Sequence, residues 1–304
     1  MDRLEAMSIL IAAVEAGSFT AASRTLGVPL PTISRKVADL EARLKARLLI
    51  RTTRKLTLTD AGSAYLTASR KILEQVAEAE RAAAGEYLTP RGDLAIAAPI
   101  VFGRLHVLPA VNEFLAAFPD INVQLALSDR NADLVGDQLD IALRIGALDD
   151  SSMIAQRAGF VRRVVCASPD FLKRHGMPKT PADLAAFPCV TFGSNAVASW
   201  PFAPKRRSPL LVPIRARLAV NTAEAALDAA VAGVGLTQVL SYQAANAVRD
   251  KRLKIVLKEF EPEPMPVHLV YPAQTLPPLK LRRFLEFALP RLKKALAEIE
   301  KRVG

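Results

Sequence analysis

Cysteine, histidine and aromatic residues are scarce in this chain of 304 residues. It contains two cysteines, three histidines and 6% aromatic residues. Cys166 and Cys189 lack a CxxC spacing and are too few for a disulfide framework, so we expect ordinary buried thiols. The histidines lie far apart in the sequence, and no metal site is predicted because none of them forms a cluster with ligand spacing.

Long apolar runs are also missing, although 51% of the residues are hydrophobic. No stretch approaches the roughly 18 consecutive apolar residues that mark a membrane span. The first residues mix acidic and basic side chains before a helically spaced apolar pattern, which does not fit a signal or transit peptide. The sequence therefore predicts a cytoplasmic protein with no membrane partner.

Catalytic and cofactor motifs are absent by spacing as well. No nucleophile with a base, metal cluster or paired acids can be recognised. Gly233-Val234-Gly235 matches the start of a dinucleotide-binding loop, but Gln238 occupies the third glycine position. We predict no catalytic residues and no cofactor, and hence a protein that is not an enzyme.

Positive charge is abundant. There are 41 Lys and Arg residues against 30 Asp and Glu residues, a formal net charge of +11, which favours a polyanionic partner. No acidic residue lies between Glu41 and Asp60, and this densest basic segment contains Arg43, Lys45, Arg47, Arg51, Arg54 and Lys55. Such a segment is suited to contact the phosphate backbone of double-stranded DNA.

Three short helices are predicted before this basic segment. The first covers residues 4–14 and stops at Gly17, and the second covers residues 19–26 between Ser18 and Gly27. The third carries an apolar stripe opposite Arg35, formed by Ile33, Val37, Leu40 and Leu44. Two short helices joined by a tight turn are typical of a helix-turn-helix. A small helical bundle with a solvated charged face is the alternative interpretation.

A hairpin wing and a long helix follow in the pattern. Residues 48–58 predict two strands around a basic turn, placed to contact the phosphate backbone. Thr59 then caps a long helix with a sustained apolar seam that runs to Ala83. Such a seam needs a partner helix, either the same helix of a second subunit or another part of its own chain. The DNA-contacting residues that we predict are Thr32, Ser34, Arg35, Arg51, Thr52, Thr53, Arg54 and Lys55.

The remaining two hundred residues alternate strand and helix patterns, which predicts two α/β lobes with mostly parallel sheets. The first lobe is expected to contain strands at 94–98, 121–127 and 139–145 and helices at 108–118 and 131–138. The second is expected to contain strands at 161–167, 216–220 and 234–240 and helices at 169–175 and 222–232. A strand at 267–271 and a helix from 279 would return the chain to the first lobe.

Several stretches resemble the LysR-type transcriptional regulators. They are SFTAASRTLGVPLPTISRKVADLEARL, RTTRKLTLTDAG, GDQLDIALRIG, ASPDFLKRHGMPKTPADLAAFP and VNTAEAALDAAVAGVGL. Thr32, Ser34 and Arg35 match the family's usual recognition-helix residues, whereas Pro29 and Leu30 stand where a Ser-Gln pair is common. Leu30 cannot donate a hydrogen bond to a base as Gln does.

The resemblance implies a fold class that combines an α/β protein with an N-terminal all-α winged helix-turn-helix, a long linker helix and a two-lobed effector domain like a periplasmic binding protein. The domains would be residues 1–58 for DNA binding, 59–88 for the dimerisation helix and 89–304 for effector binding. Lobe I would cover about 91–161 and 267–304, and lobe II about 162–266.

In such a domain the ligand cleft lies at the carboxyl ends of the strands, where helix N-termini favour an anionic effector. Ile100 and Val101 replace a common hydroxyl residue of the family, which implies either a less polar ligand or no tightly bound one. The predicted pocket consists of Pro99, Ile100, Val101, Phe102, Gly103, Arg144, Gly146, Phe192, Asn221, Thr222, Thr237 and Gln238.

The function that the sequence predicts is sequence-specific transcriptional regulation by a dimer or tetramer. A small-molecule effector bound between the lobes would change the placement of paired DNA-binding modules. The alternative is a cytoplasmic small-molecule-binding protein without a DNA-reading function.

Overall fold

The computed structural model describes residues 2–51, 56–83, 89–130, 133–134, 136–148, 153–193, 199–203, 210–273 and 277–303. Contacts between residues divide the chain into two compact units, Met1–Gly92 (unit 1) and Asp93–Gly304 (unit 2).

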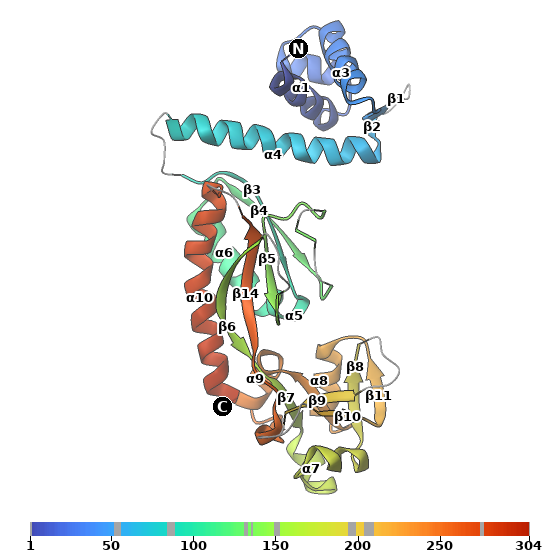
Figure 1. Ribbon diagram of the computed structural model, residues 1–304, viewed down its shortest axis with the longest axis vertical. Coiled ribbons are helices and arrows are strands. Elements are labelled where there is room, and N and C mark those ends of the chain that lie inside the picture. Colours follow the sequence, from blue (N-terminus) through green and yellow to red (C-terminus); the bar gives the residue numbers. More distant parts are fainter. Residues whose placement is uncertain are drawn as a thin grey trace. The chain divides into compact units, whose positions relative to one another are not determined.

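Unit 1 begins with three helices, continues in a two-stranded hairpin and ends in one long helix (Figure 1). The three helices, the antiparallel hairpin and the long helix predicted from the sequence are confirmed. In order, the elements are α1 (Arg3–Glu15), α2 (Phe19–Leu26), α3 (Leu30–Leu44), β1 (Leu49–Arg51), β2 (Leu56–Leu58) and α4 (Asp60–Ala83).

Local capping signals set the helix ends of unit 1. The Ser18 side chain accepts a hydrogen bond from Ala21 N at 3.1 Å at the start of α2. Gly27 ends the same helix with a φ of 65°, a left-handed conformation that glycine adopts without steric cost. At the start of α4, Thr59 Oγ1 accepts from Gly62 N at 2.9 Å.

The apolar stripe of α3 enters the core of unit 1. Ile33, Val37 and Leu40 are buried against Ile9 and Leu10 of α1. Wing residues join the same core, because Leu48 and Leu49 are buried with them. The core therefore fixes which face of α3 remains outside.

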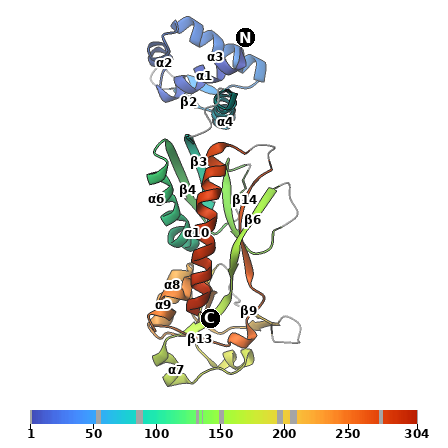
Figure 2. The same ribbon diagram turned by 90° about the vertical axis from the view of Figure 1, so that its left-hand side faces the viewer.

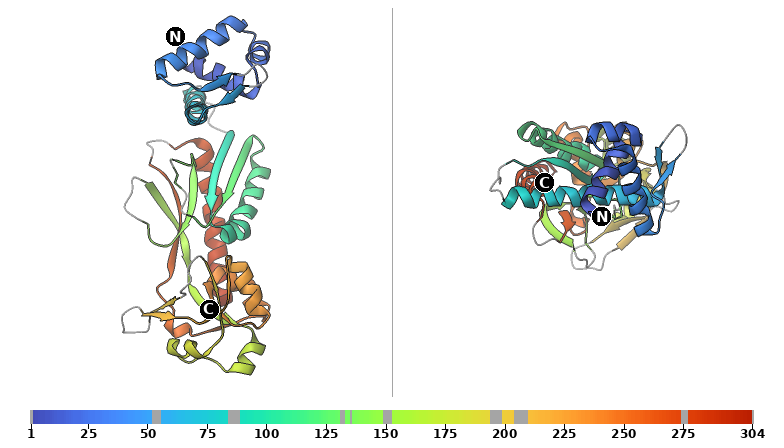
Figure 3. Two further views of the ribbon diagram at one scale, coloured as in Figure 1. Left: turned by 90° about the vertical axis from the view of Figure 1, so that its right-hand side faces the viewer. Right: turned by 90° about the horizontal axis from the view of Figure 1, so that it is seen from above.

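Unit 2 consists of two lobes, seen as separate halves in Figure 3. Lobe I is a five-stranded sheet of order β4-β3-β5-β14-β6 covered by helices. Its strands are β3 (Gly92–Ala98), β4 (Ile121–Leu127), β5 (Ile141–Ile145), β6 (Met153–Val161) and β14 (Met265–Pro272), and its helices are α5 (Ile100–Phe102), the π-helix η1 (Gly103–Val107), α6 (Leu108–Ala117) and α10 (Leu279–Val303).

Helices α6 and α10 lie side by side on lobe I (Figure 2). Phe114 of α6 packs edge-to-face against Phe284 of α10, with 5.3 Å between ring centroids. The segment Ile100–Ala117 is long and apolar enough to cross a membrane by composition alone. In the structure it comprises α5, η1 and α6, and Phe102 and Phe114 are fully buried in the core of lobe I. Core packing accounts for its apolar character.

Lobe II is a second five-stranded sheet, of order β11-β8-β12-β7-β13, with a separate hairpin. Its strands are β7 (Arg163–Ala167), β8 (Cys189–Phe192), β11 (Ala216–Val220), β12 (Leu236–Leu240) and β13 (Lys254–Val256), and the hairpin is β9 (Ser199–Phe202) with β10 (Leu210–Pro213). Its helices are α7 (Pro169–His175), η2 (Pro181–Ala186), α8 (Ala223–Val231), α9 (Ser241–Arg249) and η3 (Lys258–Phe260).

Two expectations about unit 2 are wrong. The described residues of segment 131–138 form turns, not a helix, and Gln138 has a positive φ of 57°. The sheets are mixed: β3 pairs parallel to β5 and β8 to β11 and β12, but β14 runs antiparallel to β5 and β6, and β7 antiparallel to β12 and β13. The chain leaves lobe I along β6 and returns to it along β14. These two strands run in opposite directions between the lobes and therefore pair antiparallel.

The two cysteines are free and buried, as predicted. Strand β12 separates their strands, because it pairs with β7 on one side and β8 on the other. Cys166 packs with Leu227 of α8, whereas Cys189 packs with Phe171 of α7 in a different cluster. Burial raises the pKa of both thiols to about 12.

Candidate DNA-binding surface and effector cavity

The outer face of α3 carries the candidate base-reading residues. Thr32 and Arg35 are one helical turn apart and therefore share this face, opposite the buried stripe, while Ser34 lies at its edge. Arg35 is exposed, and Thr32 and Ser34 are half-buried. Among the described residues, the Arg35 guanidinium has no carboxylate partner.

The neighbouring cation is used differently. Lys36 forms an ion pair with Glu5 and so ties α3 to α1. Of these two adjacent positive charges, one holds the helices together and the other faces outward. Leu30, at the first turn of α3, is 41% exposed, so an apolar side chain stands at the end of the helix nearest the predicted DNA contacts.

The hairpin is attached to α3 by a carboxylate that the sequence interpretation did not single out. Glu41 Oε1 accepts hydrogen bonds from Leu48 N at 2.7 Å and from Leu49 N at 3.0 Å. The hairpin is thereby held at the end of α3. The side chain of Arg51 and all of Thr52, Thr53, Arg54 and Lys55 lie outside the described residues, so their DNA contacts remain predictions.

A cavity of about 630 Å³ opens between the two lobes of unit 2. It lies at the carboxyl ends of β3, β8 and β12, where α/β sheets place their ligands. Apolar side chains dominate its wall, and the charged residues that line it are Asp129, Arg130, Asp137, Arg144 and Arg163. Such a mixture of apolar wall and few polar groups is typical of a small-molecule site.

Three of the predicted pocket residues line this cavity, namely Pro99, Arg144 and Phe192. Other predicted residues of lobe I lie elsewhere. Val101, Phe102 and Gly103 are buried in the core of lobe I, and a Cβ on Gly103 would meet Leu127 at 2.3 Å. Ile100 is exposed beside Pro99, and Gly146 donates its N–H to Pro266 O.

Apart from Phe192, the predicted residues of lobe II are displaced from the wall by one or a few positions. Thr222 caps α8 by accepting from Ala225 N, and it is Ala223, two residues after Asn221, that lines the cavity. Thr237 and Gln238 are buried within β12, where Gln238 donates to Pro201 O. The wall is formed instead by the end of this strand and the start of α9, at Val239, Leu240, Tyr242 and Gln243.

An aromatic cluster joins η1 of lobe I to α9. The ring of His106 lies 4.8 Å from that of Phe102 and 6.1 Å from that of Tyr242. Burial, together with the positive charge of Arg302, lowers the pKa of His106 from 6.5 to about 4. Burial also raises the pKa of Tyr242. Both groups are therefore neutral near pH 7.

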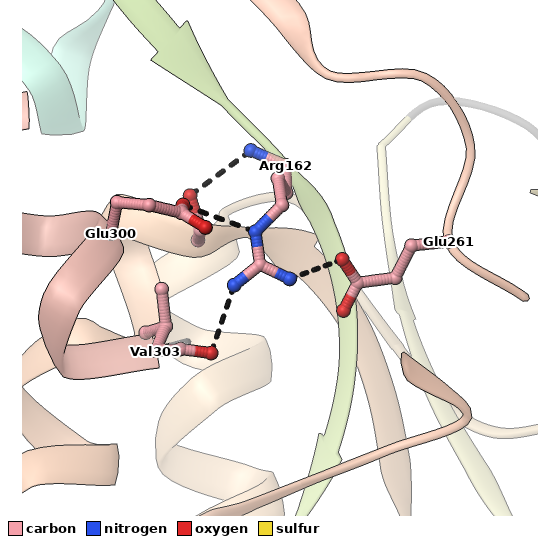
Figure 4. Close-up of polar contacts among 5 residues, drawn as sticks. Arg162, Glu261, Glu300 and Val303 are labelled. Atoms are coloured by element: carbon pink, nitrogen blue, oxygen red, sulfur yellow. Dashed lines mark hydrogen bonds and ion pairs between the residues drawn. The ribbon is translucent and has the colours of Figure 1, made fainter. Parts of the chain in front are cut away.

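One arginine joins the two chain segments that cross between the lobes (Figure 4). Arg162, between β6 and β7, forms an ion pair with Glu261, which precedes β14. Its guanidinium also donates to Glu300 Oε2 at 3.1 Å and to Val303 O at 2.8 Å, near the end of α10. Burial raises the pKa of Glu261, and the Arg162 charge opposes this shift.

A second polar contact between the lobes lies at the surface. Arg104 of η1 and Glu224 of α8 are 3.5 Å apart, and both side chains are exposed. Exposed pairs of this kind contribute little stability. The lobes are thus linked by a largely buried Arg162–Glu261 ion pair at the crossovers and by a weaker exposed pair elsewhere.

A helix-turn-helix with a hairpin wing, followed in the same chain by a two-lobed domain with a cavity between its lobes, defines the class of ligand-responsive DNA-binding regulators. Residues 4–63 match the family model described as bacterial regulatory helix-turn-helix protein, lysR family, and residues 89–293 match the LysR substrate binding domain. The chain belongs to the LysR family of transcriptional regulators, which is not an enzyme class.

Relatives agree over nearly the whole chain. An HTH-type transcriptional repressor of Pseudomonas aeruginosa is 34% identical over 95% of this chain and 92% of its own length. The transcriptional activator AaeR of Escherichia coli is 32% identical over 93% of this chain and 91% of its own. One relative is named a repressor and the other an activator, so both directions of control occur among proteins similar to this chain.

Solved structures show the same architecture. The full-length Vibrio cholerae virulence activator AphB superimposes with a TM-score of 0.60 at 27% identity, covering 95% of this chain and 99% of that chain. CrgA of Neisseria meningitidis gives a TM-score of 0.61 at 28% identity, with 96% and 99% covered. The predicted family, fold class and regulatory function are confirmed: the protein is a LysR-type regulator with a DNA-binding helix-turn-helix and an effector-binding domain.

Proposed function

We propose that this regulator reads its operator with Thr32, Ser34 and Arg35 while the wing segment 51–55 contacts phosphates. The observation that carries the proposal is the exposed Arg35, on the face opposite the core stripe, next to a Lys36 that is engaged with Glu5. A guanidinium there has the reach and donor geometry to bind a guanine edge.

The domain roles follow the predicted partition. Residues 1–58 bind DNA, residues 59–88 pair two subunits, and residues 89–304 bind the effector. Pairing supports the proposal because helix-turn-helix proteins commonly read two half-sites as dimers. The protein acts in the cytoplasm, where its DNA lies, as a dimer or tetramer, and it has no enzymatic activity.

The effector is a small anionic molecule bound in the cavity between the lobes. Three arginines and two aspartates line that cavity, which supports a negatively charged ligand. Contacts on both lobes would let the ligand favour one lobe arrangement over another. Binding can shift the placement of paired DNA-binding units only through such a difference in affinity.

The test is fluorescence anisotropy of the full chain on the DNA upstream of its own gene, across a salt series. We expect affinity to fall steeply with salt, because phosphate contacts release counterions. Arg35→Ala should weaken specific binding by roughly 10- to 100-fold and abolish the preference over scrambled DNA.

Arg217→Ala is the matched control, because it removes an equal charge from an exposed position of unit 2. It should leave the preference unchanged. No binding to the upstream DNA or to random duplex at any salt concentration would contradict the DNA-reading proposal and favour a small-molecule-binding protein.

A further inference from the structure

Arg163 is the first residue of β7 and lines the cavity between the lobes. It directly follows Arg162, which is engaged at the crossover. In the sheet it stands opposite Leu240 of β12, another cavity residue. Arg163 therefore belongs to lobe II, whereas Pro99 and Arg144 reach the same cavity from lobe I.

The guanidinium of Arg163 is half-buried, and it has no hydrogen-bond or ion-pair partner within the described part of the chain. Burial lowers its pKa, and no carboxylate among the described residues offsets the lost hydration. A cation removed from water without an anion destabilises the protein unless a ligand supplies the missing charge.

The other charged residues of the cavity are placed differently. Asp129 accepts a hydrogen bond from Ile100 N at 3.0 Å, at the start of α5, and Asp137 accepts one from Asp133 N at 2.9 Å within its own turn, so each carboxylate already binds a backbone N–H. Arg130 is exposed to solvent, and Arg144 has an interaction of its own within the protein. Arg163 therefore differs from the other cations of the cavity wall. It is half-buried, and its guanidinium has no partner among the described residues.

We propose that Arg163 binds the acid group of the effector and thereby selects a small monocarboxylic acid with an apolar body. Three arginines against two aspartates leave one positive charge in the cavity wall, which matches a single carboxylate better than a doubly charged phosphate. Guanidinium and carboxylate form paired parallel hydrogen bonds. The apolar body would contact Phe192, Leu240 and Met265.

The inference rests on the proposed anionic effector but names the residue that recognises it. An acid held by Arg163 from lobe II and touching Pro99 on lobe I would bridge the lobes next to the crossover at Arg162. Arg163 would then determine both which ligands bind and whether binding draws the lobes together.

The test uses sodium acetate as probe and the neutral acetamide as its match, at about 100 mM and equal ionic strength. Acetate is small enough that shape cannot exclude it from this cavity. Thermal unfolding of the full chain is followed by the fluorescence of Trp200, the chain's one tryptophan, which is buried in lobe II. Acetate should raise the Tm of the wild type by about 2 °C more than acetamide does.

Arg163→Gln should lose this difference, and Arg163→Lys should keep part of it. Arg217→Gln, which removes an equal charge from an exposed position outside the cavity, should keep all of it. Without acetate, Arg163→Gln should unfold at the wild-type temperature or above, because an uncompensated charge has been removed. A decrease of several degrees would instead mark Arg163 as a structural cation and overturn the inference.

Two further outcomes separate this inference from the proposed function. Acetate protection that survives in Arg163→Gln but disappears in Arg144→Gln would overturn the role of Arg163 and leave the anionic effector intact. Equal effects of acetate and acetamide on the wild type would overturn both the role of Arg163 and the proposal of an anionic effector.

Discussion

Arg162 and Glu261 form an ion pair that connects the two chain segments crossing between the lobes of unit 2. Their side chains are only 11% and 10% exposed. The pair brings together positions 99 residues apart in sequence. Because both charges are largely removed from water, loss of either partner leaves the other less well compensated.

We therefore expect Glu261→Ala to lower the free energy of unfolding of unit 2 by about 2–4 kcal/mol, since Arg162 would keep only its more exposed partner Glu300. Urea denaturation monitored by Trp200 fluorescence measures this change. Glu286→Ala, which breaks the exposed pair with Arg283, should change stability by less than about 0.5 kcal/mol. Equal effects of the two variants would contradict a special role for the crossover pair.

His106 predicts a pH dependence of stability in unit 2. Its pKa is about 4 in the folded protein against 6.5 as the unperturbed value, so the unfolded state takes up the proton first as pH falls. Its contribution is fully present above pH 6.5 and is lost progressively down to about pH 4, by up to roughly 3 kcal/mol. His106→Asn should flatten the slope of unfolding free energy between pH 7 and 5. Parallel profiles for variant and wild type would rule out this assignment.

Gly62 marks a close approach between α4 and the segment before the wing. A Cβ at this position would lie 2.0 Å from Leu48 O, a backbone atom that Thr59 N also contacts. Gly62→Ala should destabilise unit 1 by about 1–3 kcal/mol and displace the wing. Ser63→Ala, at an exposed neighbouring position, is the control. Circular dichroism of thermal unfolding and DNA affinity provide the two readouts, and unchanged values in both would contradict the close contact.

We expect the two cysteine thiols to react slowly with disulfide-exchange reagents in the native protein. Cys166 and Cys189 are buried and have pKa values of about 12, so almost no thiolate is present at pH 8. A disulfide-exchange reagent should react with neither cysteine in the native protein and with both in urea. Rapid modification of the native protein at pH 8 would show that one of the strands opens readily.

Much of unit 1 could be predicted because its signals are local. The cap at Ser18 and the turn at Gly27 each depend on a few neighbouring residues, and the stripe through Ile33 and Val37 repeats within one helix. The role of Glu41 could not be predicted in this way. Its carboxylate binds backbone groups seven and eight residues away, and only the folded hairpin brings them within reach.

By itself, the sequence determined the order of the elements, the helix-turn-helix and the alternation that builds two α/β lobes, because periodicity and capping act over a few residues. Tertiary structure decided which side chains meet: Arg163 and Tyr242 entered the cavity wall, Phe102 and Thr237 went into the core, and Arg162 met Glu261. The reason is physical, since the face that a strand residue presents and the partner of a buried charge depend on packing between segments far apart in the chain.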